Sequence, residues 1–275
     1  MDIGTIDYWA IGKRSFLHSA SPLYKMIFVI SVIASVVITN NFVVLISIYL
    51  TLLGLVVLTR LPFFKVVWIS AYPVIFAVLF AVSSWHGDWI APANIVLKAL
   101  DAALATVILI VTTPYPSVFS LISPFLPRLI VEGLFLTYRS LFILLGLMGN
   151  LIRALKVRGG LSPGRYVKNV TNFASGIGLL IIRGFELSER LYGVMSIRGY
   201  SGMLAGEEIR KRFTQEDIVP VAVGLLILFI SLGERFKRGL GQYSIYFFIA
   251  SALFVFGAAF YVYLLYVLGG AYWKK

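Results

Sequence analysis

The 275-residue sequence contains no cysteine and only two histidines. The absence of cysteine excludes disulfide bonds, thiolate metal sites and cysteine nucleophiles. The two histidines, His18 and His86, lie far apart in the chain and form no metal-ligand pattern. Charged residues make up only 13% of the chain, and they form no recognisable set of acid, base and nucleophile. The sequence therefore predicts a protein that is not an enzyme and that has no catalytic residues, metal site or cofactor.

Apolar residues, in contrast, make up 60% of the chain, and the mean hydropathy is +0.93. A soluble protein of this length could not bury so much apolar surface, so part of it must face lipid. The net charge is +12. In a membrane protein such an excess of Lys and Arg is typical of cytoplasmic loops beside anionic lipid head groups. We therefore expect a multi-pass plasma-membrane protein whose basic residues face lipid, and no nucleic-acid partner.

Four apolar segments in residues 1–113 are long enough to cross a membrane and form a predicted N-terminal membrane domain. They cover residues 26–39, which are just long enough together with Leu23 and Tyr24, and residues 42–59, 66–83 and 95–113. Pro73 is expected to kink the third segment. Lys25 and Lys65 fall on one side of these spans, whereas the loop with Trp85 and Trp89 carries little positive charge and suits the outer surface. The positive-inside rule thus predicts a cytoplasmic N-terminus.

Residues 114–212 have a different pattern. Four of the ten prolines fall in residues 114–127 and leave room only for a short helix near 117–122. Two long helices are predicted next, at about 128–159 and 168–199. The first has polar or small residues along one face, as an amphipathic helix does: Arg128, Glu132, Arg139, Gly146, Asn150 and Arg153. Because residues 150–212 hold eleven of the 24 basic residues, we expect a cytoplasmic module here.

Two further apolar segments, 219–232 and 243–269, complete a predicted all-α polytopic membrane protein with about six transmembrane helices. The predicted domains are thus 1–113, the cytoplasmic module 114–212, and the C-terminal membrane segments 213–275. Arg235, Lys237 and Arg238 lie between the last two segments. If both segments cross, this basic loop is outside, against the positive-inside rule. Either the segment 219–232 is too short to cross, or the loop is an exception.

One short pattern occurs twice in the basic module. Two apolar residues and an arginine stand at positions i, i+4 and i+7, and a glycine follows at the position of a left-handed helix cap. The copies are Leu151, Leu155, Arg158 and Gly159, and Leu191, Met195, Arg198 and Gly199. A single arginine at such a place can simply complement the helix dipole. Two copies favour a different function, the docking of an arginine-ended helix into an apolar groove with a carboxylate at its end.

Intramembrane charges are the remaining candidates, because they can mark a translocation path. Lys98 and Asp101 stand three residues apart in the fourth predicted span. We expect Lys98 to reach toward the outer surface and to form a local pair with Asp101. Glu132 and Arg139 are interpreted as part of a structural polar stripe.

The two arginine patterns carry a resemblance to a known family. Val157-Arg158-Gly159 and Ile197-Arg198-Gly199 resemble the two Ala-Arg-Gly signatures of the T components of energy-coupling factor (ECF) transporters, which include the Q subunit of cobalt importers. Three further stretches resemble the same family and occur in the same order. They are residues 17–25 (LHSASPLYK), residues 112–139 and the residues leading into the second copy. The sequence departs from the family at Val157 and Ile197, where alanine is usual, and at Ser21, where aspartate commonly precedes the proline.

The resemblance implies a transmembrane scaffold of an ATP-driven importer. Arg158 and Arg198 would each pair with acidic groups on one of two ABC-type ATPase subunits. The long helices would pass the ATPase motion to a small membrane-embedded subunit that binds the substrate, which is cobalt, nickel or a vitamin. The chain itself would bind no nucleotide, and it contains no G-x-x-x-x-G-K-[ST] phosphate loop. The alternative is a stand-alone secondary transporter or channel, which requires an inverted repeat and polar groups at mid-membrane.

Overall fold

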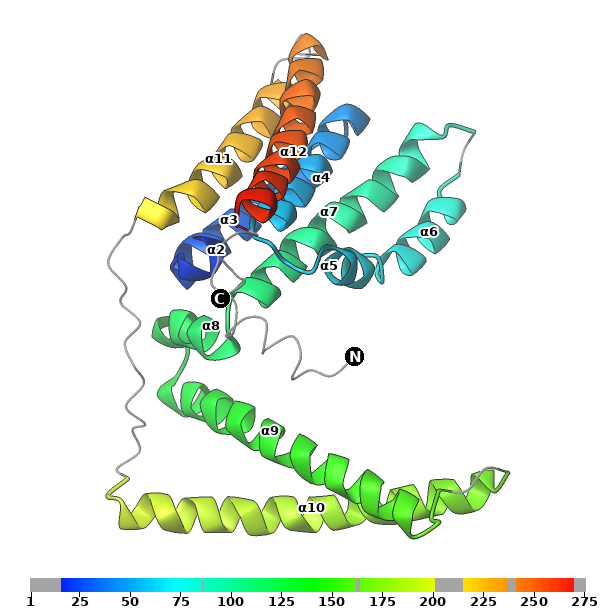
Figure 1. Ribbon diagram of the computed structural model, residues 1–275, viewed down its shortest axis with the longest axis vertical. Helices are drawn as coiled ribbons and strands as arrows, with labels where there is room; N and C mark the ends of the chain where they lie inside the picture. The colour runs from blue at the N-terminus through cyan, green and yellow to red at the C-terminus, as the bar shows by residue number, and fades with distance from the viewer. Residues whose placement is uncertain (1–15, 86, 162–163, 201–214, 237–240, 270–275) are drawn as a thin grey trace. The chain divides into compact units, whose positions relative to one another are not determined.

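The computed structural model describes residues 16–85, 87–161, 164–200, 215–236 and 241–269, and its regular elements are helices (Figure 1). No strand occurs in these ranges, which confirms the predicted all-α class. The helices are α2 (Phe16–Ser19), α3 (Pro22–Ile38), α4 (Phe42–Leu58), α5 (Phe63–Ser70), α6 (Val74–Ser83), α7 (Ile90–Thr112), α8 (Tyr115–Ile122), α9 (Arg128–Val157), α10 (Tyr166–Ile197), α11 (Gln215–Phe236) and α12 (Gly241–Gly269), with the 3-10 turn η1 (Ser123–Phe125) between α8 and α9.

Six helices in the described part of the chain are long and apolar enough to cross a membrane, in agreement with the predicted number. They are Phe63–Ser83, which combines α5 and α6, and then Ile90–Thr112, Arg128–Val157, Tyr166–Ile197, Asp217–Arg235 and Ser244–Val262. The set differs from the predicted one, because α9 and α10 qualify by length and composition, whereas α3 and α4 have 17 residues each and count as shorter apolar helices. Seventeen residues rise by about 25 Å, close to the thickness of a hydrocarbon core.

The chain divides into two compact units. The first consists of Met1–Tyr115 with Arg210–Lys275, and we call it the bundle. The second consists of Pro116–Ile209, and we call it the hairpin unit.

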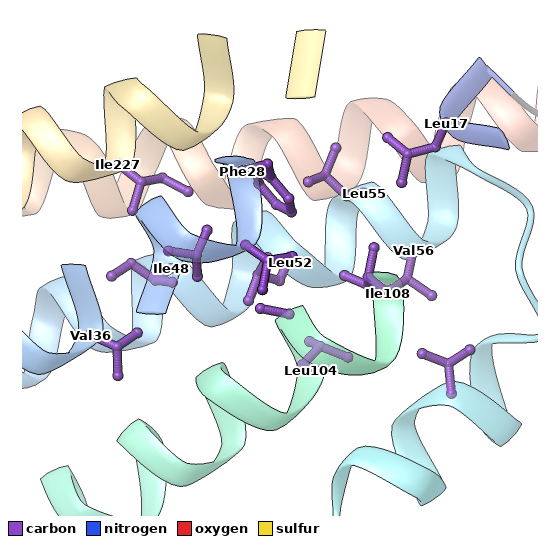
Figure 2. Packing of buried hydrophobic residues seen from close by; sticks show 14 of the residues in the cluster. Leu17, Phe28, Val36, Ile48, Leu52, Leu55, Val56, Leu104, Ile108 and Ile227 are labelled. Carbon is purple, nitrogen blue, oxygen red and sulfur yellow. The ribbon is translucent and has the colours of Figure 1, made fainter. Parts of the chain in front are cut away.

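The core of the bundle lies between α3, α4 and α7. Ile48, Leu52 and Leu55 recur every three or four residues on one face of α4, and each is at most 1% exposed. Figure 2 shows them beside Phe28 of α3 and Leu104 of α7. Because lipid is as apolar as these side chains, close packing and interhelical hydrogen bonds stabilise such a core more than the hydrophobic effect does.

The helix α11 runs parallel to α3 and close to it. At one end, the backbone N–H of Ser21 donates to Asp217 Oδ1 over 2.6 Å. At the other end, Ser231 Oγ donates to the Ser35 carbonyl over 2.9 Å. Between them Gly224 lies against Phe28, where an added Cβ would come within 3.1 Å of Phe28 Cα. A small residue at the crossing lets the two backbones approach.

The parallel arrangement of α3 and α11 explains why a positive charge, Arg235, lies at the end of α11. The helix α11 has 22 residues, so the explanation that its segment is too short to cross is wrong. Arg235 Nη1 lies 3.5 Å from the Ile38 carbonyl, at the C-terminal end of α3 and therefore at the end of the bundle opposite to Ser21. A cation there complements the negative end of the α3 dipole, which explains a positive charge at this place. Lys237 and Arg238 lie outside the described residues.

The predicted kink at Pro73 is present as a break between α5 and α6. Both helices place small residues toward α7. Ser70, Ala77 and Ala81 are among them, and all three are buried. Their other face is aromatic and exposed: Phe64, Trp68, Tyr72, Phe76 and Phe80 stand at every fourth position and are 64–87% exposed. Such a face suits contact with lipid or with another membrane protein.

In the hairpin unit, α9 and α10 form an antiparallel pair that crosses near its connecting turn and diverges toward the other end (Figure 1). Leu151 fills the space at Gly176, where an added Cβ would lie 2.7 Å from Leu151 Cδ2. At the diverging end, the hydroxyl of Tyr200 donates to the carboxylate of Glu132. The short helix expected after the first prolines is α8, and its Phe119 ring packs edge-on against Phe135 of α9.

Candidate functional site

The two predicted arginines occupy the same position at the ends of two helices. Arg158 is the C-cap of α9, with φ −80° and ψ 6°. Arg198 is the C-cap of α10, with φ −80° and ψ 9°. The sequence pattern therefore corresponds to one local structure that occurs twice.

The glycine after each arginine ends its helix in the left-handed conformation, as the sequence predicts. Gly159 has φ +67° and Gly199 has φ +76°. In the first copy the next N–H, that of Gly160, donates to the Leu155 carbonyl over 2.8 Å. In the second copy the N–H of Tyr200 donates to the Met195 carbonyl over 3.0 Å. These are the bonds of a Schellman motif, which requires a residue that tolerates positive φ after the C-cap.

Each arginine follows a large apolar side chain that is almost fully exposed. Val157 and Ile197 are both 89% exposed. Arg158 and Arg198 are exposed too, and neither guanidinium forms a hydrogen bond or ion pair with the described residues. Each helix end thus presents an apolar side chain and a free guanidinium next to each other, which fits an apolar groove that contains a carboxylate.

The predicted supporting residues have a different environment. Leu151 and Leu155 are half-buried: Leu151 packs against Gly176, and Leu155 contacts Gly160 at the turn. Leu191 and Met195 are half-buried in the second helix. The structure therefore gives Leu151 a role in packing α9 against α10.

The residues that share the exposed face with each arginine were not singled out by the sequence pattern. They stand one and four positions before it: Ala154 and Val157 in α9, Val194 and Ile197 in α10, all exposed. The sequence signal for this exposed face is a pair of apolar residues at positions i and i+3 followed by an arginine at i+4. This pattern occurs in both helices.

The two arginines lie at opposite ends of the hairpin because α9 and α10 are antiparallel. Asn172 Nδ2 donates to the Gly160 carbonyl over 2.8 Å, which places the end of α9 beside residue 172 of α10. The 26 residues from Asn172 to Arg198 are helical up to the C-cap, and they correspond to about 39 Å at 1.5 Å per residue. The arginines are thus two separate contact points.

The charges around the two points differ. Residues 153–168 contain Arg158 and four further basic residues, and no Asp or Glu occurs between Glu132 and Glu186. On the Arg198 side, Arg183 forms an ion pair of 2.8 Å with Glu186. Glu132 accepts the hydrogen bond from Tyr200, and this bond raises the pKa of the Tyr200 hydroxyl above its ordinary value.

The intramembrane candidates Lys98 and Asp101 do not form the expected pair. Lys98 Nζ donates instead to Asn40 Oδ1 over 2.8 Å and lies 3.5 Å from the Val37 carbonyl, at the C-terminal end of α3. Asp101 is 0% exposed, and neither of its carboxyl oxygens has a hydrogen-bond partner among the described residues. The expectation failed because the turn after α3 offers Lys98 acceptors that the sequence of α7 does not reveal.

The other candidates stay apart from the arginine sites. Glu132 lies in α9 and bonds Tyr200, while Arg139 is exposed on the same helix. His18 is in α2, and His86 lies outside the described residues. Within the part of the chain that the structure covers, no three His, Asp or Glu side chains gather as a metal site would require.

The comparisons with known proteins identify the family. The model of a family of cobalt transport proteins, CbiQ, matches residues 13–208, well over half of the chain. This chain belongs to the CbiQ family. The match includes α2 to α10 and both arginine motifs, and the CbiQ chain is thus a multi-pass component of a membrane transport system. No curated protein matches the chain.

Proposed function

We propose that this CbiQ-family chain is the transmembrane scaffold of an ECF-type ABC importer. It would link two ABC-type ATPase subunits to a small membrane-embedded subunit that binds the substrate. The observation that carries the proposal is the repeated helix end, with Arg158 and Arg198 in the same cap geometry and each beside a side chain that is 89% exposed.

The mechanism follows from these two helix ends. Val157 and Ile197 would enter apolar grooves on the ATPases, and each guanidinium would pair with a carboxylate inside the groove. A separation of about 39 Å allows each arginine to contact a different subunit. Movement of the ATPases would then displace the two ends of one helical hairpin, and the hairpin would pass the movement to the substrate-binding subunit.

The proposal includes a location for each part of the chain. Residues 1–113 and 213–275 would form the membrane domain in the plasma membrane, and residues 114–212 would form a coupling module on the cytoplasmic side, with the N-terminus cytoplasmic. The many basic residues and the nearly complete lack of acidic ones around Arg158 support the cytoplasmic side. The transported substrate would be cobalt, nickel or a vitamin, chosen by the partner subunit.

The stand-alone secondary transporter receives little support from the bundle. Asp101 is the polar group near the middle of α7, and it is fully buried. A substrate path would require access to it.

Co-purification from native membranes in mild detergent tests the proposal. The wild-type chain should bring down ABC-type ATPases and a small hydrophobic protein. Arg158→Glu and Arg198→Glu should each weaken ATPase recovery, and the double variant should abolish it while still inserting into the membrane. Lys156→Glu is the matched control, because it makes the same charge change two residues before Arg158 and should keep ATPase binding. Full ATPase recovery and uptake by the double variant would refute the proposal.

A further inference from the structure

The end of α9 differs from the end of α10 in the charges that accompany its arginine. Residues 153–168 contain five basic residues and no acidic one. The stretch of equal length that ends at the second arginine, residues 183–198, contains three basic and two acidic residues. The formal charge is therefore +5 for the first stretch and +1 for the second. Two arginines with the same cap geometry thus have different electrostatic surroundings.

Two of the cations near Arg158 come from the start of α10. Asn172 Nδ2 donates to the Gly160 carbonyl over 2.8 Å, so this face of α10 lies against the turn that follows α9. Lys168 stands one helical turn before Asn172 on the same face, and Arg165, the N-cap residue of α10, stands one turn earlier still. Both side chains are exposed, and neither forms a hydrogen bond or ion pair with the described residues. We call Arg158, Arg165 and Lys168 the basic end.

The other two basic residues of this stretch point elsewhere. Arg153 Nη2 donates to Asn150 Oδ1 over 2.7 Å, so its guanidinium is held along α9. Lys156 stands two residues before Arg158, and residues two apart do not share a face of a helix. The basic end therefore excludes both of them, although they add to the positive charge of the sequence.

The end of α10, in contrast, has an anion close to its arginine. Tyr200 follows Arg198 by two residues, and its hydroxyl donates to the carboxylate of Glu132. This carboxylate from α9 therefore lies at the helix end that presents Arg198. Residues 201–212, which lie outside the described ranges, continue the sequence with two acidic and three basic residues. A partner that binds Arg198 thus meets charges of both signs.

We propose that the basic end docks on an acidic surface of its ATPase through Arg158, Arg165 and Lys168 together, whereas the end of α10 docks through Arg198 alone. This inference rests on the proposed function, which supplies the ATPases, and it adds that the two contacts differ in electrostatic strength. Opposite charges steer association and raise its rate, and salt screens them. The contact at the basic end is therefore the faster to form and the more sensitive to salt.

The repeated cap favours a protein partner for the basic end over anionic lipid head groups. Lipid head groups attract positive charge as such and require no particular helix cap. The same cap, with an arginine beside an apolar side chain that is 89% exposed, occurs at the end of α10, where the charges are mixed. Arg158 therefore has the same kind of partner as Arg198, and Arg165 and Lys168 extend its surface.

The test measures the two contacts separately, with the tagged full chain in mild detergent and the ATPases that it recovers from native membranes. Arg198→Ala leaves the contact at the basic end. Arg158→Ala combined with Arg165→Gln and Lys168→Gln leaves the contact at the end of α10. Between about 50 mM and about 500 mM salt the Debye length falls from about 14 Å to about 4 Å. ATPase binding by the first variant should fall steeply over this range, and binding by the second should change little.

The contribution of the two added cations is measured in the Arg198→Ala chain. Arg165→Gln with Lys168→Gln should lower its affinity for the ATPase by roughly 2- to 30-fold at low salt, the range for two exposed charge pairs, and should flatten the salt dependence. Lys156→Gln is the matched control, because it removes one positive charge from a different side of α9. It should leave both the affinity and the salt dependence close to those of the Arg198→Ala chain.

Equal salt dependence of the two contacts would overturn the inference, as would an unchanged affinity after Arg165→Gln with Lys168→Gln. A loss seen only in nanodiscs that contain phosphatidylglycerol, and not in detergent, would assign these two cations to lipid head groups and would also overturn it. Failure of the wild-type chain to recover any ATPase would refute the proposed function and this inference with it. ATPase recovery with equal salt dependence would refute the inference alone.

Discussion

Three glycine-to-alanine variants test whether the helix crossings in the bundle have been understood. An added Cβ at Gly224 would lie 3.1 Å from Phe28 Cα and 3.4 Å from the Phe28 carbonyl oxygen, both backbone atoms. At Gly54 it would lie closer to its neighbour, 2.6 Å from Phe254 Cδ1, but that neighbour is the end of a side chain. At Gly257 nothing lies within 4 Å. Whether the neighbouring atom belongs to the backbone or to a side chain, and not its distance from the added Cβ, should decide how much stability each variant loses.

The magnitudes follow from these contacts. Carbon atoms prefer separations of roughly 3.5–4.0 Å, so Gly224→Ala must push α11 from α3 by about 0.5 Å, and overpacking of this kind costs roughly 1–3 kcal/mol. Alanine gains up to about 1 kcal/mol of helix propensity at any of the three sites. Gly224→Ala should therefore lose about 1–2 kcal/mol. Gly54→Ala should stay within about 1 kcal/mol of wild type because the Phe254 ring, 37% exposed, can turn away. Gly257→Ala should gain up to about 1 kcal/mol.

The assay is unfolding of the purified chain in mild detergent, followed by the fluorescence of its five tryptophans. The expected order of stability is Gly257→Ala, then Gly54→Ala, then Gly224→Ala. If Gly54→Ala proved the least stable of the three, the Phe254 ring would be fixed and the reasoning would be refuted.

Three further predictions concern single sites. Asp101→Leu should raise the free energy of unfolding by about 1–3 kcal/mol, because it removes a buried carboxyl without a partner among the described residues; a loss of stability in the same assay would reveal a partner. Gly159→Ala and Gly199→Ala should each lower the free energy of unfolding by about 1–2 kcal/mol, since both glycines have positive φ. If the double variant still bound ATPases as the wild type does, the cap geometry would not be needed for binding. The hydrogen bond to Glu132 raises the pKa of Tyr200. This bond therefore stabilises the folded protein fully below the ordinary tyrosine pKa near 10. The stabilisation is lost as the pH rises through the raised pKa. Stability curves of wild type and Tyr200→Phe should therefore differ at pH 8 and converge at strongly alkaline pH, and a constant difference would contradict this.

Local features of the chain were predictable because local residues determine them. The break at Pro73 follows from a ring that removes a donor, and the helix ends at Gly159 and Gly199 follow from residues that tolerate positive φ. The all-α class and the number of long apolar helices follow from composition and periodicity. The packing of the side chains before each arginine was not predictable, because Leu151 faces Gly176 only once α10 folds back on α9.

Contacts between distant segments were not predictable from the pattern. Lys98 was expected to bond within its own helix, but it bonds the turn after α3. The side chain of Ser21 makes no capping bond at the start of α3, and the structure places the carboxylate of Asp217 at the Ser21 N–H. This contact joins residues 196 positions apart, and one sequence contains no signal for it.

The pairing of α3 with α11 also determines when the bundle can be completed during synthesis. The partner of Ser21 is encoded 196 residues later, and at about 5–20 residues per second the ribosome needs roughly 10–40 s to reach it. During that time α3 stands in the membrane without its cap, and its surface at Phe28 faces lipid where Gly224 will later lie. The membrane part of this protein is therefore completed by its last-made helices, and a chain that ended before α11 would leave the α3 surface at Phe28 without the helix that covers it.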